Sequence, residues 1–193
     1  SEHHPDEEVR ATSKDLLDLV TPIVKAWSTD KAFRVCELAI QVFGGGGFLE
    51  DYPVEQYLRD TKIASLYEGT NGIQALDIVG RKMRQKGGGL FMTFVQVVND
   101  FINEHRDNEN LSDIIGRLEK AQGSLGEVAF WLQQNGKEDI EKAIQQATPF
   151  LELFGDVFTG YLLAEQAVIA EQELEEKFET TYPRRNDRKD NNE

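Results

Sequence analysis

The chain has 193 residues, of which 39% are hydrophobic and 29% charged, enough for one ordinary domain or two small helical ones. A formal net charge of −14 disfavours nucleic acid and anionic membrane surfaces as partners, because like charges repel. Cys36 is the only cysteine, so no intramolecular disulfide can form, which fits a reducing compartment. No apolar run reaches membrane-spanning length and nothing resembles a signal peptide, so we expect no membrane insertion.

The first part of the chain predicts a polar, disordered segment followed by helices. Residues 1–13 are polar, and the adjacent His3 and His4 indicate a frayed terminus rather than a metal site. Apolar residues at helical spacing then predict a helix from Lys14 to Trp27. Pro22 falls inside this pattern and either kinks the helix or starts a second one.

A second helix is expected over residues 30–43, with Asp30 as its N-cap. It is apolar nearly all round, which predicts burial among other helices, and Gln41 is its last polar residue. The glycines at positions 44–47 end it. A glycine run alone favours a C-terminal cap and loop, but it also provides a backbone surface that a cofactor can approach closely.

The next stretch predicts two further helices with a carboxylate between them. Pro53 suits the first turn of a helix, and Asn71 and Gln74 have the spacing of a capping box. Glu68 therefore lies just before a helix N-terminus. The helix dipole stabilises a carboxylate there without any catalytic role.

The glycines at positions 87–89 mark the clearest boundary in the chain. Three amphipathic stripes follow, so we predict an all-α protein with one helical part at 14–86 and a helical extension at 87–176. The longest helix of the extension is expected to pass through Phe154, Phe158 and Leu162, all buried, with Pro149 as a kink before them. The charged tail, 177–193, is expected to be disordered.

The motifs between residues 41 and 81 resemble those of the flavin-dependent acyl-CoA dehydrogenases. They are Gln41-Val42-Phe43-Gly44-Gly45, Arg59-Asp60-Thr61-Lys62 and Tyr67-Glu68-Gly69-Thr70, in that order and spacing. The resemblance implies the end of the family's C-terminal helical domain, and the extension after Gly87 is similar to the extra C-terminal domain of larger members. It further implies that the N-terminal helical domain and the β-domain are missing, so the isolated chain should neither bind FAD tightly nor turn over substrate.

The resemblance also implies roles for individual residues. Glu68 matches the base that removes the α-proton of an acyl-CoA thioester, and its backbone N–H matches an oxyanion donor. Gly69 would let the thioester lie close to the chain. The matches to FAD-binding residues are Gln41, Gly44, Gly45 and Thr70. In the family, Gln41, Gly44 and Gly45 serve the flavin of a neighbouring subunit, which predicts a homodimer or homotetramer. Gly72 departs from the family pattern, where a long polar residue often touches FAD.

The implied reaction oxidises an acyl-CoA to a trans-2-enoyl-CoA, with FAD as cofactor and electron-transfer flavoprotein as acceptor. The alternatives are an acyl-CoA oxidase, an enzyme like 3-methylthiopropionyl-CoA dehydrogenase, or a non-catalytic helical interaction module. The expected location is the cytoplasm of a bacterium or the mitochondrial matrix of a eukaryote.

Overall fold

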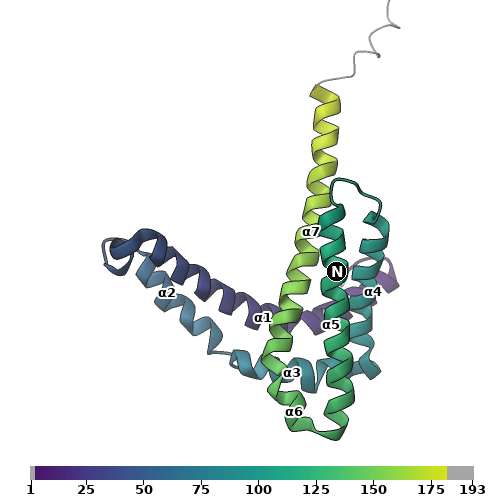
Figure 1. Ribbon diagram of the computed structural model, residues 1–193, viewed down its shortest axis with the longest axis horizontal. Helices are drawn as coiled ribbons and strands as arrows, with labels where there is room; N and C mark the ends of the chain where they lie inside the picture. Colours follow the sequence, from purple (N-terminus) through teal and green to yellow (C-terminus); the bar gives the residue numbers. More distant parts are fainter. Residues whose placement is uncertain (1–2, 182–193) are drawn as a thin grey trace, which may run out of the picture.

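The computed structural model describes residues 3–181, which contain helices and turns and no strand, confirming the predicted all-α class. Figure 1 shows the arrangement of the helices. The α-helices are α1 (Glu7–Phe43), α2 (Val54–Lys62), α3 (Asn71–Gly80), α4 (Gly89–His105), α5 (Ser112–Glu138), α6 (Ile140–Gln145) and α7 (Ala147–Thr181). Short 3₁₀ helices connect some of them: η1 (Gly44–Phe48), η2 (Ile63–Ser65) and η3 (Lys82–Gly88).

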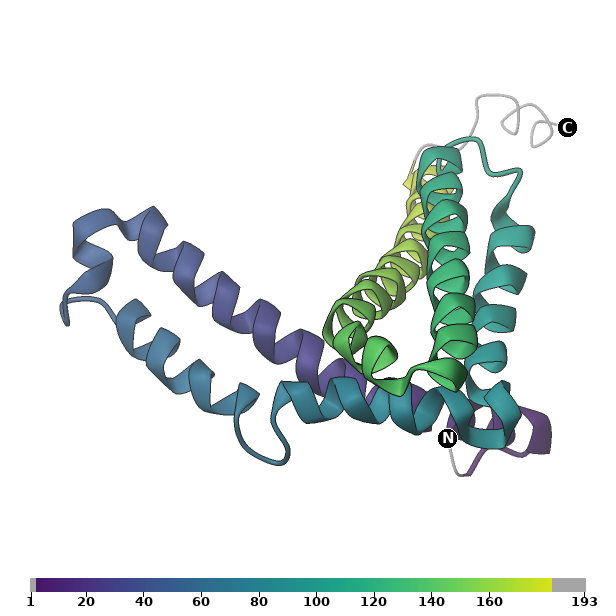
Figure 2. The same cartoon turned by 60° about the horizontal axis from the view of Figure 1, so that its bottom comes forward.

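Most of the molecule is a bundle in which α4, α5 and α7 pack together above α3 and the first half of α1 (Figures 1 and 2). We call residues 3–31 and 67–181 the body. Its core is continuous across the predicted boundary: Leu19, Ile23 and Ile78 belong to the same buried cluster as Phe94 and Phe154. The turn at Gly87 and Gly88 is left-handed at both glycines, so the chain changes direction there while the core continues.

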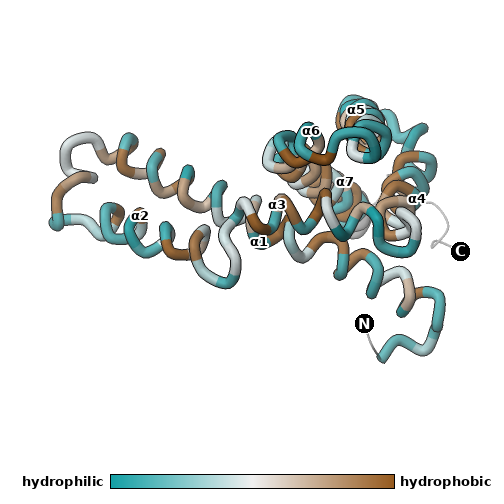
Figure 3. The backbone as a smooth tube through the Cα atoms, turned by 90° about the horizontal axis from the view of Figure 1, so that it is seen from below, coloured by the Kyte–Doolittle hydropathy of each residue, from teal (hydrophilic) through white to brown (hydrophobic). Residues whose placement is uncertain are grey.

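The second half of α1 and α2 project from the body as an antiparallel pair, closed at the tip by η1 (Figure 2). We call residues 32–66 the arm. Side-chain contacts between its helices include Cys36 Sγ, 3.4 Å from Thr61 Oγ1, the Lys62 ammonium over the Phe33 ring, and the rings of Phe43 and Tyr52, 5.2 Å apart. Figure 3 shows apolar positions along the arm, where much apolar surface is exposed. The predicted burial of helix 30–43 is therefore wrong within this chain, because α2 covers only one side of it.

The N-terminal prediction was wrong for residues 7–13, which are helical. The Asp6 carboxylate accepts a 2.8 Å hydrogen bond from the backbone N–H of Glu8, so Asp6 caps α1. From there α1 runs to Phe43 without interruption, so Pro22 starts no new helix and Asp30 caps none. Leu19 and Ile23 flank Pro22 and are buried against the body, and this packing outweighs the local cost of a proline.

The C-terminal helices follow the predicted stripes with shifted ends. α5 continues through Gly136, and α7 begins at Ala147, which places Pro149 in its first turn, where helix N–H groups lack partners anyway. With 35 residues, α7 is longer than α4, α5 and α6, which confirms the prediction of the longest helix in the extension, although α1, with 37 residues, is longer still. Phe154 is buried as expected, but Leu162 is 36% exposed.

Helix α7 includes part of the tail that was predicted to be disordered. It remains helical through Thr181, so that prediction was wrong for residues 177–181, and residues 182–193 lie outside the described part. Within residues 3–181, the stretch Ala147–Leu174 alone is long and apolar enough to cross a membrane. Length and composition alone do not place a helix in a membrane, and one face of this helix, with Phe150, Phe154 and Val157, packs in the core.

Candidate active site

The loop from Tyr67 to Thr70 lies where the arm returns to the body, directly before α3. Glu68 has a left-handed backbone, with φ 55°, and Gly69 follows with φ 85°. A non-glycine residue rarely adopts this conformation, so its occurrence at the candidate base is notable. The Glu68 side chain is exposed, and its carboxylate has no hydrogen-bond or ion-pair partner among residues 3–181. A substrate can therefore approach it without displacing a protein partner.

The N-terminus of α3 completes this loop. Thr70 is the N-cap residue, but its hydroxyl makes no capping hydrogen bond and is left for another ligand. Gln74 does not form the predicted capping box with Asn71. Its Nε2 instead donates to the backbone oxygens of Glu68 and Gly69, at 3.4 and 3.3 Å. The amide thus ties the loop to the first turn of α3, whose dipole favours a negative group nearby.

Gln41, Gly44 and Gly45 lie together at the tip of the arm, all exposed. A Cβ added at Gly44 or Gly45 would meet no atom within 4 Å, so packing within this chain explains neither glycine, although φ 60° at Gly44, where α1 ends, itself favours glycine. The position that packing does require is Gly47, where a Cβ would lie 2.8 Å from the backbone oxygen of Ile40. The two exposed glycines thus leave the backbone open to a ligand or partner.

The structure places the predicted site residues in two separate groups. Lys25 contacts Gly69 at the base of the arm, and Gln41 lies further along the same helix at the tip. At about 1.5 Å per helical residue, Lys25 and Gln41 are about 24 Å apart. One chain therefore does not bring Gln41, Gly44 and Gly45 next to Glu68.

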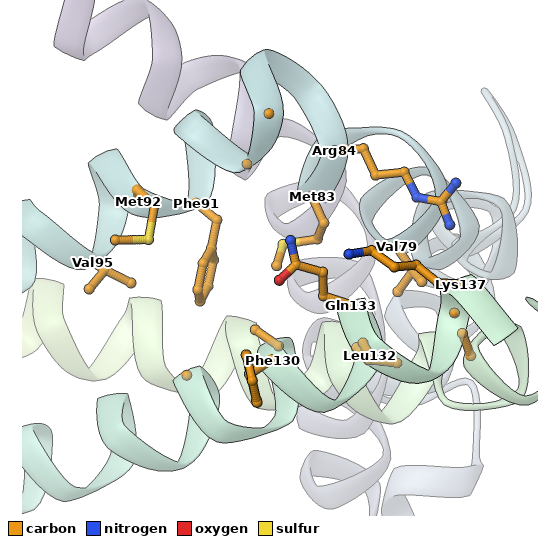
Figure 4. Close-up of a pocket in the computed structure, with 16 residues that line it drawn as sticks. Val79, Met83, Arg84, Phe91, Met92, Val95, Phe130, Leu132, Gln133 and Lys137 are labelled. Carbon is orange, nitrogen blue, oxygen red and sulfur yellow. The ribbon is translucent and has the colours of Figure 1, made fainter.

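A cavity of about 920 Å³ opens in the body between η3, α4 and α5 (Figure 4). Apolar side chains such as Met83 and Phe91 line it, with Arg84 and Lys137 also on its wall. Neither cation forms an ion pair with an acid in the described residues. None of the predicted site residues lines the cavity. The rise of α3, about 15 Å for its ten residues, separates it from the Glu68 loop.

Four titratable groups in the body have displaced pKa values, and Asp77, Arg81, Tyr161 and Glu171 all lie outside the Glu68 loop. A side-chain hydrogen bond from Arg81 lowers the pKa of Asp77 in α3. In α7, burial raises the pKa of Tyr161, and its hydrogen bond to Glu165 adds to the effect. No group of three or more His, Cys, Asp or Glu side chains is arranged to hold a metal ion within the described residues.

Comparisons with known proteins match both the arm and the body. Residues 7–83 match the family described as "Acyl-CoA dehydrogenase, C-terminal domain", and residues 94–188 match "Acetyl-CoA dehydrogenase C-terminal like". The 3-methylmercaptopropionyl-CoA dehydrogenase of Ruegeria pomeroyi is 34% identical over 175 residues, which is 90% of this chain and 30% of that protein. The broad-specificity linear acyl-CoA dehydrogenase FadE5 of Mycobacterium tuberculosis is 38% identical over 160 residues, which is 79% of this chain and 26% of that protein.

A solved structure titled "Bd2924 apo-form" shares the fold, with a TM-score of 0.50 and 24% identity over 78% of this chain and 26% of that one. The matches define a helical C-terminal region of an enzyme family. The chain belongs to the acyl-CoA dehydrogenases and corresponds to the C-terminal part of longer members. It spans less than a third of the length of the two curated relatives named above.

Sequence reasoning missed three residues that the structure brings into the argument. Gly47 is required by packing at the tip of the arm, and Lys25 and Asn71 hold the Glu68 loop. A signal existed for Lys25, because it interrupts the buried side of α1 between Ile23 and Ala26. Nothing in the spacing indicated that its partner lies after the arm.

Proposed function

We propose that this chain is the C-terminal part of an FAD-dependent acyl-CoA dehydrogenase that oxidises an acyl-CoA thioester to a trans-2-enoyl-CoA. The observation that carries the proposal is the Glu68 loop in a chain of this family. An exposed carboxylate without a protein partner lies there on a left-handed backbone before a helix N-terminus. The isolated chain, without the domains that longer members carry, is expected to be inactive.

Glu68 can serve as the general base for the α-proton of the thioester. The proton is weakly acidic, so its removal requires a positioned base and stabilisation of the oxygen that becomes negative. Within residues 3–181 the backbone N–H of Glu68 has no acceptor, which leaves it free to donate to that oxygen. Gly69 would let the thioester lie close to the chain, and its φ of 85° is one that residues with a Cβ rarely adopt.

FAD, when bound, would accept the β-hydride of the substrate. The residues present fit such a cofactor in two places: the free Thr70 hydroxyl at the start of α3, and the open backbone at Gly44 and Gly45 beside Gln41. Because these places are far apart within one chain, we propose that they serve two different flavins. The protein would then be a homodimer or homotetramer in which the tip of each arm reaches a neighbouring subunit.

The chemistry is tested by Glu68→Gln in the full-length polypeptide. The amide is nearly isosteric but cannot accept the proton, so kcat should fall by about 100- to 10,000-fold with flavin content unchanged. Glu50→Gln, which alters an exposed glutamate in the arm, is the matched control and should keep its activity. Near-normal turnover of Glu68→Gln would place the base elsewhere and contradict the proposal.

Flavin binding at the tip of the arm is tested with a pair of glycine variants. Gly45→Val should lower the flavin content per chain while leaving the melting temperature of the apoprotein nearly unchanged, because a Cβ there meets nothing in this chain. Gly47→Ala should instead lower the melting temperature with or without FAD, because its Cβ would meet Ile40. Equal loss of stability in both variants would mean that Gly45 serves the fold alone.

The electron acceptor separates the dehydrogenase from the oxidase alternative. Full-length enzyme should reduce electron-transfer flavoprotein and react slowly with oxygen, and rapid peroxide formation would favour the oxidase. One matched relative is named for 3-methylmercaptopropionyl-CoA, which supports assaying that thioester beside linear acyl-CoAs. We propose the bacterial cytoplasm, or the mitochondrial matrix in a eukaryote, as the location. A purified 193-residue chain that carried stoichiometric flavin would contradict the proposed inactivity and favour an autonomous module.

A further inference from the structure

The Glu68 loop is held from the opposite side by polar side chains of α1. Lys25 Nζ donates to the backbone oxygen of Gly69 and to Asn71 Oδ1, both at 2.8 Å. Asn71 Nδ2 donates back to α1, to the Ala26 oxygen at 3.1 Å and to Thr29 Oγ1 at 2.9 Å. Thr29 Oγ1 is in turn 2.9 Å from the Lys25 oxygen, so the hydrogen bonds form a closed circuit between α1 and the loop.

The use of Lys25 in this circuit is unusual for an acidic chain. The sequence has 35 Asp and Glu residues, yet Lys25 forms no ion pair with any acid in the described part of the chain. Its ammonium group instead contacts a backbone oxygen and an amide oxygen. Hydrogen bonds from a charged donor are stronger than neutral ones, which makes Lys25 the strongest tie on the Gly69 carbonyl.

The hydrogen-bond circuit contacts the loop at residues whose backbone conformation is unfavourable. Glu68 and Gly69 are successive left-handed residues, and only glycine adopts that conformation readily. A residue stays in such a conformation when its surroundings hold it there. Lys25 and Gln74 both donate to the Gly69 oxygen, so the peptide between Gly69 and Thr70 is held from two helices. Gln74 also donates to the Glu68 oxygen, in the peptide between Glu68 and Gly69.

We propose that Lys25 and Asn71 form a clamp that holds the Glu68 loop in its left-handed conformation, and that Lys25 is thereby a positioning residue for proton removal. The inference rests on the proposed function of Glu68. Neither clamp residue touches the Glu68 carboxylate, so both act through the backbone. The clamp also links the loop to the part of α1 that is buried in the body, so the base is aligned with the body rather than with the arm.

The test compares variants of the full-length enzyme. Lys25→Met should lower kcat at least tenfold, keep KM within threefold of the wild-type value and leave flavin content unchanged. With α-deuterated substrate its primary isotope effect should rise, because proton removal becomes the slow step. Lys25→Arg, which still donates, should recover most of the lost kcat. Lys14→Met, an exposed lysine on the same helix, is the matched control and should behave as wild type.

Coupling within the clamp gives a second measurement. Asn71→Ala should also lower kcat at least tenfold, and the double variant with Lys25→Met should be little worse than either single one, because both remove the same circuit. Hydrogen exchange should accelerate in each variant at the amides of Tyr67 and Gln74, which donate to Ile63 and Thr70 on either side of the loop. Additive losses of kcat would overturn the clamp.

Two other outcomes would also overturn the inference. One is normal kcat in Lys25→Met. The other is loss of flavin and melting temperature together with kcat, without recovery in Lys25→Arg, which would indicate a role in folding alone. Failure of the proposed function would appear in a different variant, Glu68→Gln. If that variant kept its turnover, another residue would be the base, whatever the Lys25 variants showed.

Discussion

The arm and the body have similar apolar patterns in sequence, but apolar side chains of the body are buried and those of the arm are exposed. In the body, Phe94 and Phe154 are fully buried and pack ring against ring, with centroids 4.8 Å apart. In the arm, Phe48 is 80% exposed and Val42 is 85% exposed. An apolar stripe indicates that a surface will be covered, but the stripe does not indicate whether the cover belongs to the same chain.

The difference in burial between arm and body is consistent with a chain that spans less than a third of the length of the two curated relatives named above. The body packs α4, α5 and α7 around its own core, whereas the arm has only α2 beside α1. Large apolar side chains exposed near one another, such as Val42, Phe48 and Leu49 in the arm, are typical of an interaction site. In the proposed enzyme this surface contacts other domains or a neighbouring subunit, together with the flavin.

The sharpest test of the comparison replaces one phenylalanine in each region. Phe154→Ala removes a ring that packs against Phe91, Phe94 and Phe150, and should lower the free energy of unfolding by about 3–5 kcal/mol. Phe48→Ala should change it by less than about 0.5 kcal/mol, because the ring is already exposed. Denaturant titration of the 193-residue chain measures both. Similar losses in the two variants would show that the arm is folded against something in solution.

The packing of α1 against α7 in the body, just before the arm begins, is tested at Gly155 of α7. A Cβ there would lie 2.1 Å from the Trp27 ring of α1, whose Nε1 donates to Asp156 at 2.8 Å. Gly155→Ala forces the two helices apart and should cost about 1–3 kcal/mol of unfolding free energy. Gly160→Ala on the same helix meets nothing within 4 Å and should stabilise by about 0.5–1 kcal/mol, since alanine favours helix. If both variants are stabilised, α1 and α7 do not pack closely at this point.

Much of the body could be predicted from the sequence because its contacts are periodic. The stripes of α4, α5 and α7 follow from helical spacing, and α3 begins at Asn71 just after Glu68 as predicted, although the predicted capping box does not form. The unbroken course of α1 could not be predicted in this way. Pro22 and Asp30 are local signals for a helix boundary, but the burial of Leu19 and Ile23 outweighs them. That burial depends on helices far along the chain.

The same reason limits what could be predicted of the site. Glu68, Thr70 and the glycines came from motif spacing, and their roles stay predictions. The clamp joins Lys25 to Gly69 and Asn71, residues separated in sequence by the whole arm, and no local pattern reports such a contact. Likewise, the packing role of Gly47 could not be told apart from the open positions Gly44 and Gly45, because all three appear in one glycine run.

The smallest expected effect concerns a polar contact at the far end of the body. Asn108 and Asn110, between α4 and α5, each donate a 2.6 Å hydrogen bond to the Glu171 carboxylate of α7. These hydrogen bonds lower the pKa of Glu171 below its ordinary value of 4.5. A lowered carboxylate pKa in the folded state stabilises the fold above the unfolded pKa, and this stabilisation is lost as the pH falls through the folded pKa.

Glu171→Gln should therefore lower the melting temperature slightly at pH 7, and its difference from wild type should shrink once the pH falls below about 4.5. The contact is at the surface, where solvent screening keeps it weak, so the shift should be smaller than that of any body variant described above. Glu152→Gln, an exposed glutamate of the same helix, is the control and should show no such pH dependence. Melting curves between pH 3 and pH 7 measure the difference in melting temperature between each variant and wild type. A difference that grew as the pH fell would mean that Asn108 and Asn110 do not favour the charged carboxylate, and that the end of α7 is held by apolar packing alone.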